Sequence, residues 1–203
     1  FSINSDKSIN SIYVCYISKG DALIWIFITF IFWIYIKKVI NNNFRKNNNY
    51  LTIDKGSNQG ISSDLGVINS KGIIGITKSI SGNYATVLSI LNVNSRINAK
   101  LLNSDHYGSL SWDNLDYNIV QLLDLPIQAD IYRGDTVVTG GKSTIFPEGI
   151  PIGTIKDFKT LNNNYEYINI LLFNDMSSIG NVQVIKNFDK IEIQTLEEKS
   201  TNE

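Results

Sequence analysis

Short apolar runs separated by turn residues fill the chain from residue 50 to residue 185. Each run is only a few residues long and stops at glycine, asparagine, aspartate or serine, as strands joined by tight turns do. No segment of this region keeps an uninterrupted helical period. We therefore predict an all-β fold, a barrel or sandwich of small antiparallel units. The predicted strands are 50–53, 66–68, 73–80, 85–91, 96–102, 108–112, 119–125, 136–139, 150–155, 167–173 and 182–185.

The chain before this region contains one long apolar run, residues 22–36, which carries no charge until Lys37 and Lys38. A membrane-spanning helix needs about 20 apolar residues and at least about 17, so the run spans a bilayer only if Val39 and Ile40 extend it. Its tryptophan and tyrosine side chains suit a bilayer interface. A membrane anchor and a buried strand both stay open as interpretations.

The composition fits a folded chain that holds its partners by shape. The 203 residues are 43% hydrophobic and 18% charged, enough to bury one sizeable core or two small ones. A net charge of −1 gives no electrostatic reason to expect nucleic acid. The one cysteine, Cys15, cannot form an internal disulfide, and the one histidine, His106, cannot build a histidine cluster for zinc. We expect neither a metal nor a cofactor.

Residues 140–144, Gly-Gly-Lys-Ser-Thr, look like the end of a phosphate-binding loop. That motif needs a glycine five residues before Gly141, where this chain has Thr136, and Pro147 interrupts the helix that should follow. The pattern therefore favours a glycine-rich strand corner with a positive φ at one or both glycines.

Hydrolase chemistry has equally weak support in the sequence. The sequence contains no Gly-x-Ser-x-Gly motif that would supply a nucleophilic serine for His106. A catalytic triad would therefore have to be assembled by folding alone. We expect no catalytic residue and assign His106 to a polar turn. Four carboxylates lie near glycines in turns, where aspartate usually bonds backbone amides. They are Asp54, Asp64, Asp135 and Glu148.

Four aromatic residues are candidates either for the core or for an exposed binding patch. Aromatic residues of small barrels lie more often in the core, which favours the first assignment. The four residues are Tyr107, Trp112, Tyr132 and Phe146.

The most distinctive stretch lies in the C-terminal third, where residues 133–141 read Arg-Gly-Asp-Thr-Val-Val-Thr-Gly-Gly. Residues 145–155 follow with Ile-Phe-Pro-Glu-Gly-Ile-Pro-Ile-Gly-Thr-Ile, which predicts a strand, a bend and a second strand. This stretch resembles the signature of the MreC family of bacterial rod-shape-determining proteins, although Thr139 is followed directly by Gly140 without the usual serine. We treat the signature residues as structural. They are Gly134, Asp135, Gly140, Gly141, Phe146, Pro147, Gly149 and Gly153.

The resemblance extends over about residues 36–185 and implies two small six-stranded antiparallel β-barrels. Residues 41–95 would form the first barrel, with C-terminal strands returning to close it as an alternative. Residues 96–186 would form the second barrel and the return strands. Residues 60–76 and 149–155 share a similar pattern of glycines and apolar residues, which also suggests two related barrels. We expect the remaining parts to be a polar N-terminal segment at 1–20, an apolar segment at 21–40 that runs into the first strand, and a polar flexible tail at 187–203.

The resemblance also implies a non-catalytic scaffold of the bacterial cell-elongation machinery. Such a protein associates with itself as a dimer or filament, and docks the penicillin-binding transpeptidase of elongation and associated membrane shape proteins. It would be a periplasmic domain held by an N-terminal anchor in the inner membrane. The basic residues that follow the apolar run, Lys37, Lys38, Arg45 and Lys46, would instead place this part in the cytoplasm. We expect the periplasmic location that the resemblance implies.

The sequence leaves two other functional hypotheses open. The same strands and turns suit a periplasmic adaptor barrel of another envelope system, which would bind different partners. A chymotrypsin-like barrel hydrolase is the second alternative, and it would need a nucleophile and a base that the sequence does not display.

Overall fold

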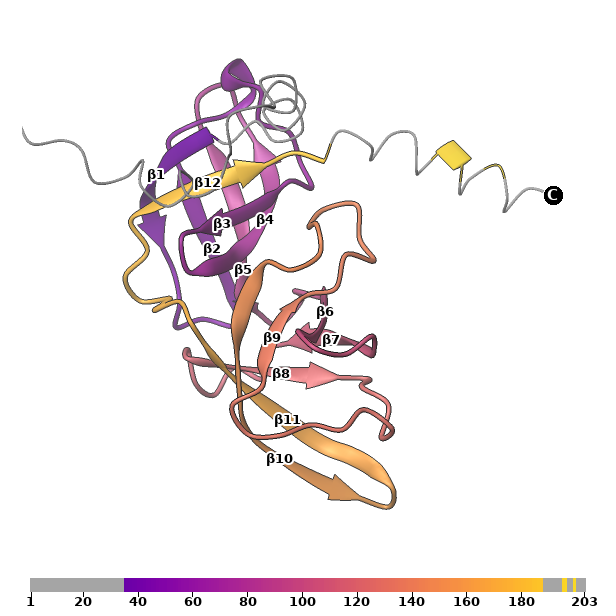
Figure 1. Cartoon of the computed structure of the whole chain (residues 1–203). Coiled ribbons are helices and arrows are strands. Elements are labelled where there is room, and N and C mark those ends of the chain that lie inside the picture. Colours follow the sequence, from indigo (N-terminus) through magenta and orange to yellow (C-terminus); the bar gives the residue numbers. More distant parts are fainter. Residues whose placement is uncertain (1–34, 188–194, 197–198, 200–203) are drawn as a thin grey trace, which may run out of the picture. The chain divides into compact units, whose positions relative to one another are not determined.

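The computed structural model describes residues 35–187, 195, 196 and 199. From 35 to 187 the chain forms strands β1 to β12 and one 3-10 turn, η1 (Ser57–Gln59), and the strands close into two antiparallel barrels (Figure 1). This confirms the predicted pair of six-stranded barrels. The anchor segment lies outside the described residues up to residue 34, as does nearly all of the tail. Among the residues that the structure describes, no helix is long and apolar enough to cross a bilayer.

The first barrel combines the N-terminal strands with the last strand of the chain. Its order is β1-β12-β3-β4-β5-β2, so β12 lies between β1 and β3 and pairs antiparallel with both. β1 and β3 do not pair with one another in this order. The strands are β1 (Tyr35–Asn42), β2 (Asn48–Ile53), β3 (Gly66–Asn69), β4 (Gly72–Ile80), β5 (Ala85–Asn92) and β12 (Asn181–Ile185).

The second barrel is formed by the strands between β5 and β12. Its order is β10-β11-β8-β7-β6-β9, and every neighbouring pair is antiparallel. The strands are β6 (Ile97–Leu101), β7 (Tyr107–Ser111), β8 (Ile119–Leu123), β9 (Thr136–Thr139), β10 (Pro151–Leu161) and β11 (Asn164–Leu172).

The strand prediction is wrong in one region, the hairpin of β10 and β11. The sequence predicts an end near Ile155 and a new start at Tyr167, whereas the strands continue to a turn at Asn162 and Asn163. Both asparagines have a positive φ, 51° and 60°, as the central residues of a tight hairpin turn do. The intervening residues are mostly polar and exposed, so they show no apolar alternation. Pairing between β10 and β11 keeps these residues in the strand conformation.

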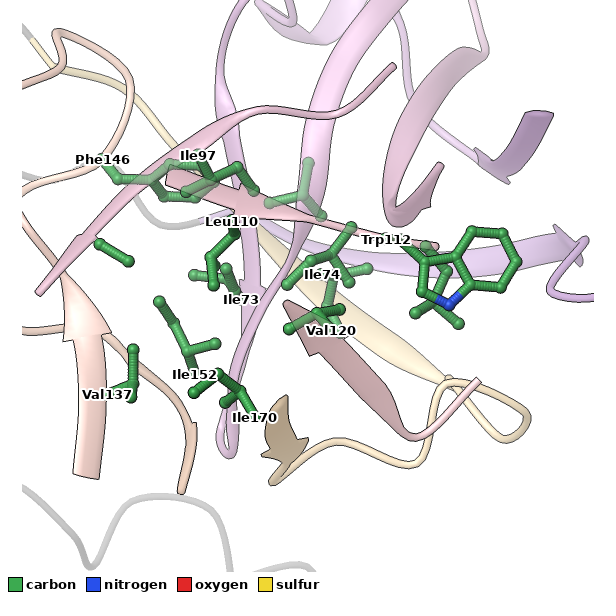
Figure 2. Packing of buried hydrophobic residues seen from close by; sticks show 14 of the residues in the cluster. Ile73, Ile74, Ile97, Leu110, Trp112, Val120, Val137, Phe146, Ile152 and Ile170 are labelled. Atoms are coloured by element: carbon green, nitrogen blue, oxygen red, sulfur yellow. The ribbon is translucent and has the colours of Figure 1, made fainter. Parts of the chain in front are cut away.

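One buried apolar cluster spans both barrels. Residues Gly72 to Gly75 of β4 are all buried, although a barrel strand with one solvated face should alternate. The outer face of β4 is therefore covered, and β10 is the strand of the second barrel that contacts it. Figure 2 shows the side chains of Ile73, Leu110 and Ile152 gathered in one interior.

The connection from β11 to β12 is fastened to the first barrel by Asn174. This side chain is 4% exposed, donates from Nδ2 to the Ile73 carbonyl at 3.1 Å, and accepts at Oδ1 from Asn69 Nδ2 at 2.7 Å. Nearby, Asn42 Nδ2 donates to the Met176 carbonyl at 2.8 Å. These bonds hold the return segment on the β3–β4 hairpin and β1.

The loop between β9 and β10 is organised by the buried Thr139. Its Oγ1 donates to the Pro147 carbonyl at 2.6 Å and accepts from the Ile150 amide at 2.9 Å. The Gly149 amide donates to the Thr139 carbonyl at 3.0 Å. Gly149 has φ +91°, a conformation that L side chains rarely adopt.

We predict that Asn174→Ala lowers the free energy of unfolding by about 1–3 kcal/mol, because it removes the buried partner of both Ile73 O and Asn69. Urea unfolding followed by tryptophan fluorescence measures the change. Asn103→Ala, at an exposed turn position after β6, is the matched control and should shift the free energy by less than about 0.5 kcal/mol. Equal shifts for the two variants would contradict the role of Asn174.

We also predict that Gly149→Val destabilises the fold far more than Ser143→Ala. A β-branched residue at φ +91° costs on the order of 1–3 kcal/mol in backbone strain, whereas Ser143 lies in the same loop without this constraint. Thermal melting of the two variants measures the difference. Melting temperatures that agree within error would show that the turn tolerates a side chain.

Candidate functional site

The signature loop, residues 140–150 between β9 and β10, joins the second barrel to the first through Phe146. This side chain is 3% exposed. A Cβ placed on Gly66 of β3 would lie 2.7 Å from Cε1 of Phe146 and 2.9 Å from Cγ1 of Ile185 of β12. The phenyl ring therefore lies directly on the Gly66 backbone, and no larger residue fits there without displacement. Phe146 belongs to the core and not to an exposed patch.

Lys100 of β6 holds the other end of the loop. Its side chain is 9% exposed, and its Nζ lies 2.5 Å from Glu148 Oε1 and 3.5 Å from Asp105 Oδ1. The hydrogen bond that Lys100 donates to Glu148 raises the pKa of the ammonium group above its ordinary value, so the group stays charged. Tyr107 completes the cluster, because its ring centroid lies 5.8 Å from Lys100 Nζ and 3.7 Å from Lys142 Nζ.

Gly134 and Asp135 lie where the chain enters β9. The Gly134 amide donates to the Ile155 carbonyl at 2.8 Å, and Asp135 Oδ2 accepts from the Tyr132 amide at 2.8 Å. The two residues line an open polar depression of about 420 Å³ between the turn after β6 and segment 130–136. Tyr132 is 68% exposed at its rim, so this aromatic residue is not part of the core.

The second barrel also carries an exposed apolar face, which we call the outer patch: Leu123, Tyr167, Leu171 and Phe173. These side chains are 37–44% exposed. Leu123 lies in β8, Tyr167 and Leu171 lie in β11, and Phe173 follows the end of β11; the two strands are paired with Asn169 opposite Gln121 and Leu171 opposite Ile119. The alternate residues of the same strands, Val120, Leu122, Ile168 and Ile170, are buried. Leu123, Tyr167 and Leu171 therefore share the outward face of this two-stranded region, and exposed Phe173 lies next to its end.

A row of polar side chains crosses this face. Asn169 Nδ2 donates to Asp157 Oδ1 at 2.9 Å, and Gln121 Nε2 donates to Asn169 Oδ1 at 3.3 Å and to Asp113 Oδ2 at 2.9 Å. These partners are mutually satisfied, so the row can be covered by a partner without leaving these amides unpaired. The face combines apolar contact area with a fixed polar stripe.

The residues that imitate a phosphate-binding loop form the strand corner that the sequence favours. Gly141 has φ +73°, and the next element after it is strand β10 and not a helix. Its neighbour Gly140 lies against the side chains of Asn98 and Tyr107. The Lys142 amide donates to Asn98 Oδ1 at 3.2 Å, so this backbone is already occupied within the fold.

His106 lies in the turn between β6 and β7, half-buried, and its backbone amide donates to Ser104 Oγ at 3.1 Å. In residues 35–187, no hydrogen bond links its imidazole to a serine hydroxyl or a carboxylate. The described residues likewise contain no group of three or more histidine, cysteine, aspartate or glutamate side chains that could hold a metal ion. Trp112 is 4% exposed and donates from Nε1 to the Asp116 carbonyl at 2.9 Å, as a core residue does.

Several organising residues escaped the sequence reasoning. Lys100, Asn174 and Thr139 are polar residues whose partners lie in distant parts of the chain or in an irregular loop, so their spacing carries no signal. Gly66 stands in the stretch that resembles the family, but nothing local indicates that Phe146 would lie on it.

Comparison with known proteins identifies a family that this chain resembles. A family model described as the barrel core of the rod shape-determining protein MreC matches residues 39–186. The cell shape-determining protein MreC of Listeria monocytogenes is 34% identical over 125 residues, which cover 60% of this chain and 42% of that protein. The chain spans about half the length of the curated relatives it matches.

Solved structures agree with the sequence comparison. The structure of MreC from Listeria monocytogenes has a TM-score of 0.70 at 29% identity and covers 77% of this chain, which covers 76% of it. MreC in the complex between penicillin-binding protein PBP2 and MreC from Helicobacter pylori shares the fold, with a TM-score of 0.57 at 14% identity. It covers 77% of this chain, and this chain covers 99% of it. The paired barrels, the loop around Phe146 and the match over residues 39–186 together show that this chain belongs to the MreC family.

Proposed function

We propose that this chain is a non-catalytic scaffold in the determination of bacterial cell shape, which associates with itself and docks a penicillin-binding transpeptidase. The observation that carries the proposal is the match of the MreC barrel core to nearly the whole of the paired-barrel region. Its place would be the periplasm, at the inner membrane, together with other membrane shape proteins. The signature residues would then be structural, since Phe146 contacts Gly66 of the first barrel and Gly134 and Asp135 hold the chain where it enters β9.

The outer patch supports the docking part of the proposal. Leu123 and Tyr167 at one end and Leu171 and Phe173 at the other flank a stripe of satisfied amide groups. Interfaces of this kind gain affinity from a few aromatic and aliphatic side chains that become fully buried. An MreC of another organism, Helicobacter pylori, forms a complex with the penicillin-binding protein PBP2, which makes a transpeptidase the partner to test first.

We predict that the chain, purified from membranes in detergent, captures the elongation transpeptidase of the same organism. Leu171→Asp should reduce the recovered transpeptidase about tenfold, because a charge in a buried interface replaces apolar contact with a desolvation cost. Leu115→Asp is the matched control, since Leu115 is 86% exposed in the β7–β8 connection, and it should leave capture unchanged. Raising salt from about 0.1 to about 1 M should weaken capture little if the contacts are apolar. Failure to capture any transpeptidase would refute the docking part.

We further predict that the purified chain turns over neither peptides, peptidoglycan nor nucleotides. The reason is that, within residues 35–187, His106 bonds only through its backbone amide, and the Gly140 and Lys142 amides already donate to Asn98. A fluorogenic peptide assay and a muropeptide digest measure this. Turnover that disappears in His106→Ala would overturn the non-catalytic proposal and favour a hydrolase.

A further inference from the structure

Among the strands that the structure describes, none pairs with one side of β10 over half of its length. β9 pairs with β10 only at Pro151, Gly153 and Thr154, whereas β10 continues to Leu161. Within residues 35–187, no strand pairs with 156–161 on that side. Figure 1 shows β10 and β11 continuing as a two-stranded hairpin that ends in a free turn. We call this stretch of β10 the open edge.

The opposite side of the hairpin is not equally available. β8 pairs with β11 only at residues 169–171, but the Tyr165 hydroxyl donates to the Ala129 carbonyl at 2.7 Å. The segment before β9 therefore reaches the part of β11 that β8 leaves unpaired, through the Tyr165 side chain. Phe158 of β10 packs edge-to-face on Tyr165, with ring centroids 6.0 Å apart, which anchors the hairpin further. The open edge of β10 is the better template for an added strand.

The backbone of Phe158 faces the open edge. Ile155 lies opposite Ile170, and its amide and carbonyl point away from β11, because they bond the Asp135 carbonyl and the Gly134 amide at 2.9 and 2.8 Å. Phe158 lies opposite Ile168, two residues from Ile170 on β11. Since hydrogen-bond direction repeats every second residue, Phe158 repeats the orientation of Ile155. Its amide and carbonyl therefore point outward.

We propose that the open edge pairs antiparallel with the open edge of a second copy of this chain, with the two-fold axis at Phe158. The inference rests on the self-association part of the proposed function and names its surface. In this register, the Phe158 amide of each copy donates to the Phe158 carbonyl of the other. Asp157 of each copy then lies opposite Lys159 of the other.

In this register, the charges on the open edge of one copy are complementary to those on the same edge of another copy. This identifies a second copy as the occupant. Asp157 and Lys159 are two residues apart and share one face of the strand, so antiparallel pairing forms two opposite-charge pairs at once. Asp157 uses Oδ1 to accept from Asn169, which leaves Oδ2 for the added lysine. Lys159 lies 2.5 Å from Glu166 Oε2, a contact that holds its side chain along the same face.

The register irregularities on either side of Phe158 limit how far such pairing extends. β10 shifts register between Ile155 and Asp157 and again between Lys159 and Thr160. Bulges of this kind interrupt a ladder and discourage continuous edge-to-edge growth. The paired segment is therefore short and closes a dimer. Because a two-fold axis at Phe158 is perpendicular to the sheet, the outer patches of both copies would lie on the same side.

The test uses two copies of the full chain in detergent with different affinity tags, and measures how much of one copy is recovered with the other. Asp157→Lys and Lys159→Asp should each reduce recovery about tenfold when both copies carry the same change, because like charges then face one another. Mixing an Asp157→Lys copy with a Lys159→Asp copy should restore recovery, since every facing pair again has opposite charges. The double exchange Asp157→Lys/Lys159→Asp should restore it as well.

Lys78→Asp is the matched control, because Lys78 is an exposed residue near the end of β4 and the change alters the charge equally in the first barrel; it should leave recovery unchanged. Circular dichroism of each variant reports whether the hairpin keeps its fold, because Lys159→Asp also removes the Glu166 contact. If the wild-type copies associate but the mixed variants do not regain recovery, the proposed edge is wrong while self-association stands. If the wild-type copies never associate, both proposals of self-association fail, and transpeptidase capture is still tested separately.

Discussion

Closure of the first barrel depends on a strand from the far end of the chain. Because β12 lies between β1 and β3, that barrel stays open until the whole second barrel has been made and the chain returns. A barrel with an unpaired gap would expose two rows of backbone donors and acceptors and part of its core. The hydrogen bonds of β12 therefore complete one barrel and fix the position at which the chain leaves the other.

The contacts between the barrels follow from this topology. With the second barrel inserted in the first, the chain crosses between them twice, from β5 to β6 and from β11 to β12, and both the return crossing and the β9–β10 loop contact the first barrel. Asn174 bonds the return segment to the β3–β4 hairpin, and Phe146 lies on Gly66 beside Ile185 of the closing strand. The apolar cluster is consequently continuous through both barrels. A protein that presents surfaces to partners benefits from such rigidity, because less conformational entropy is lost on binding.

The two exposed surfaces differ in what they offer a partner. The outer patch offers apolar side chains around a satisfied polar stripe, while the open edge of β10 offers unpaired backbone between two bulges. The first suits docking of a folded partner and the second suits pairing with another strand. Both lie on the hairpin of β10 and β11 or next to it, so self-association and partner binding would occur on neighbouring parts of one sheet.

The sequence by itself determined the local features. Apolar runs between turn residues identified nearly all strands, the Gly140–Gly141 pair identified a corner with a positive φ, and the stretch around Phe146 identified the family. Each depends on neighbours within a few residues. Tertiary structure alone decided that Lys100 is buried on Glu148, that Asn69 meets Asn174, 105 residues away, and that polar residues after Ile155 stay in a strand. The physical reason is that these states depend on partners brought by distant pairing, and such partners leave no periodic trace in the local sequence.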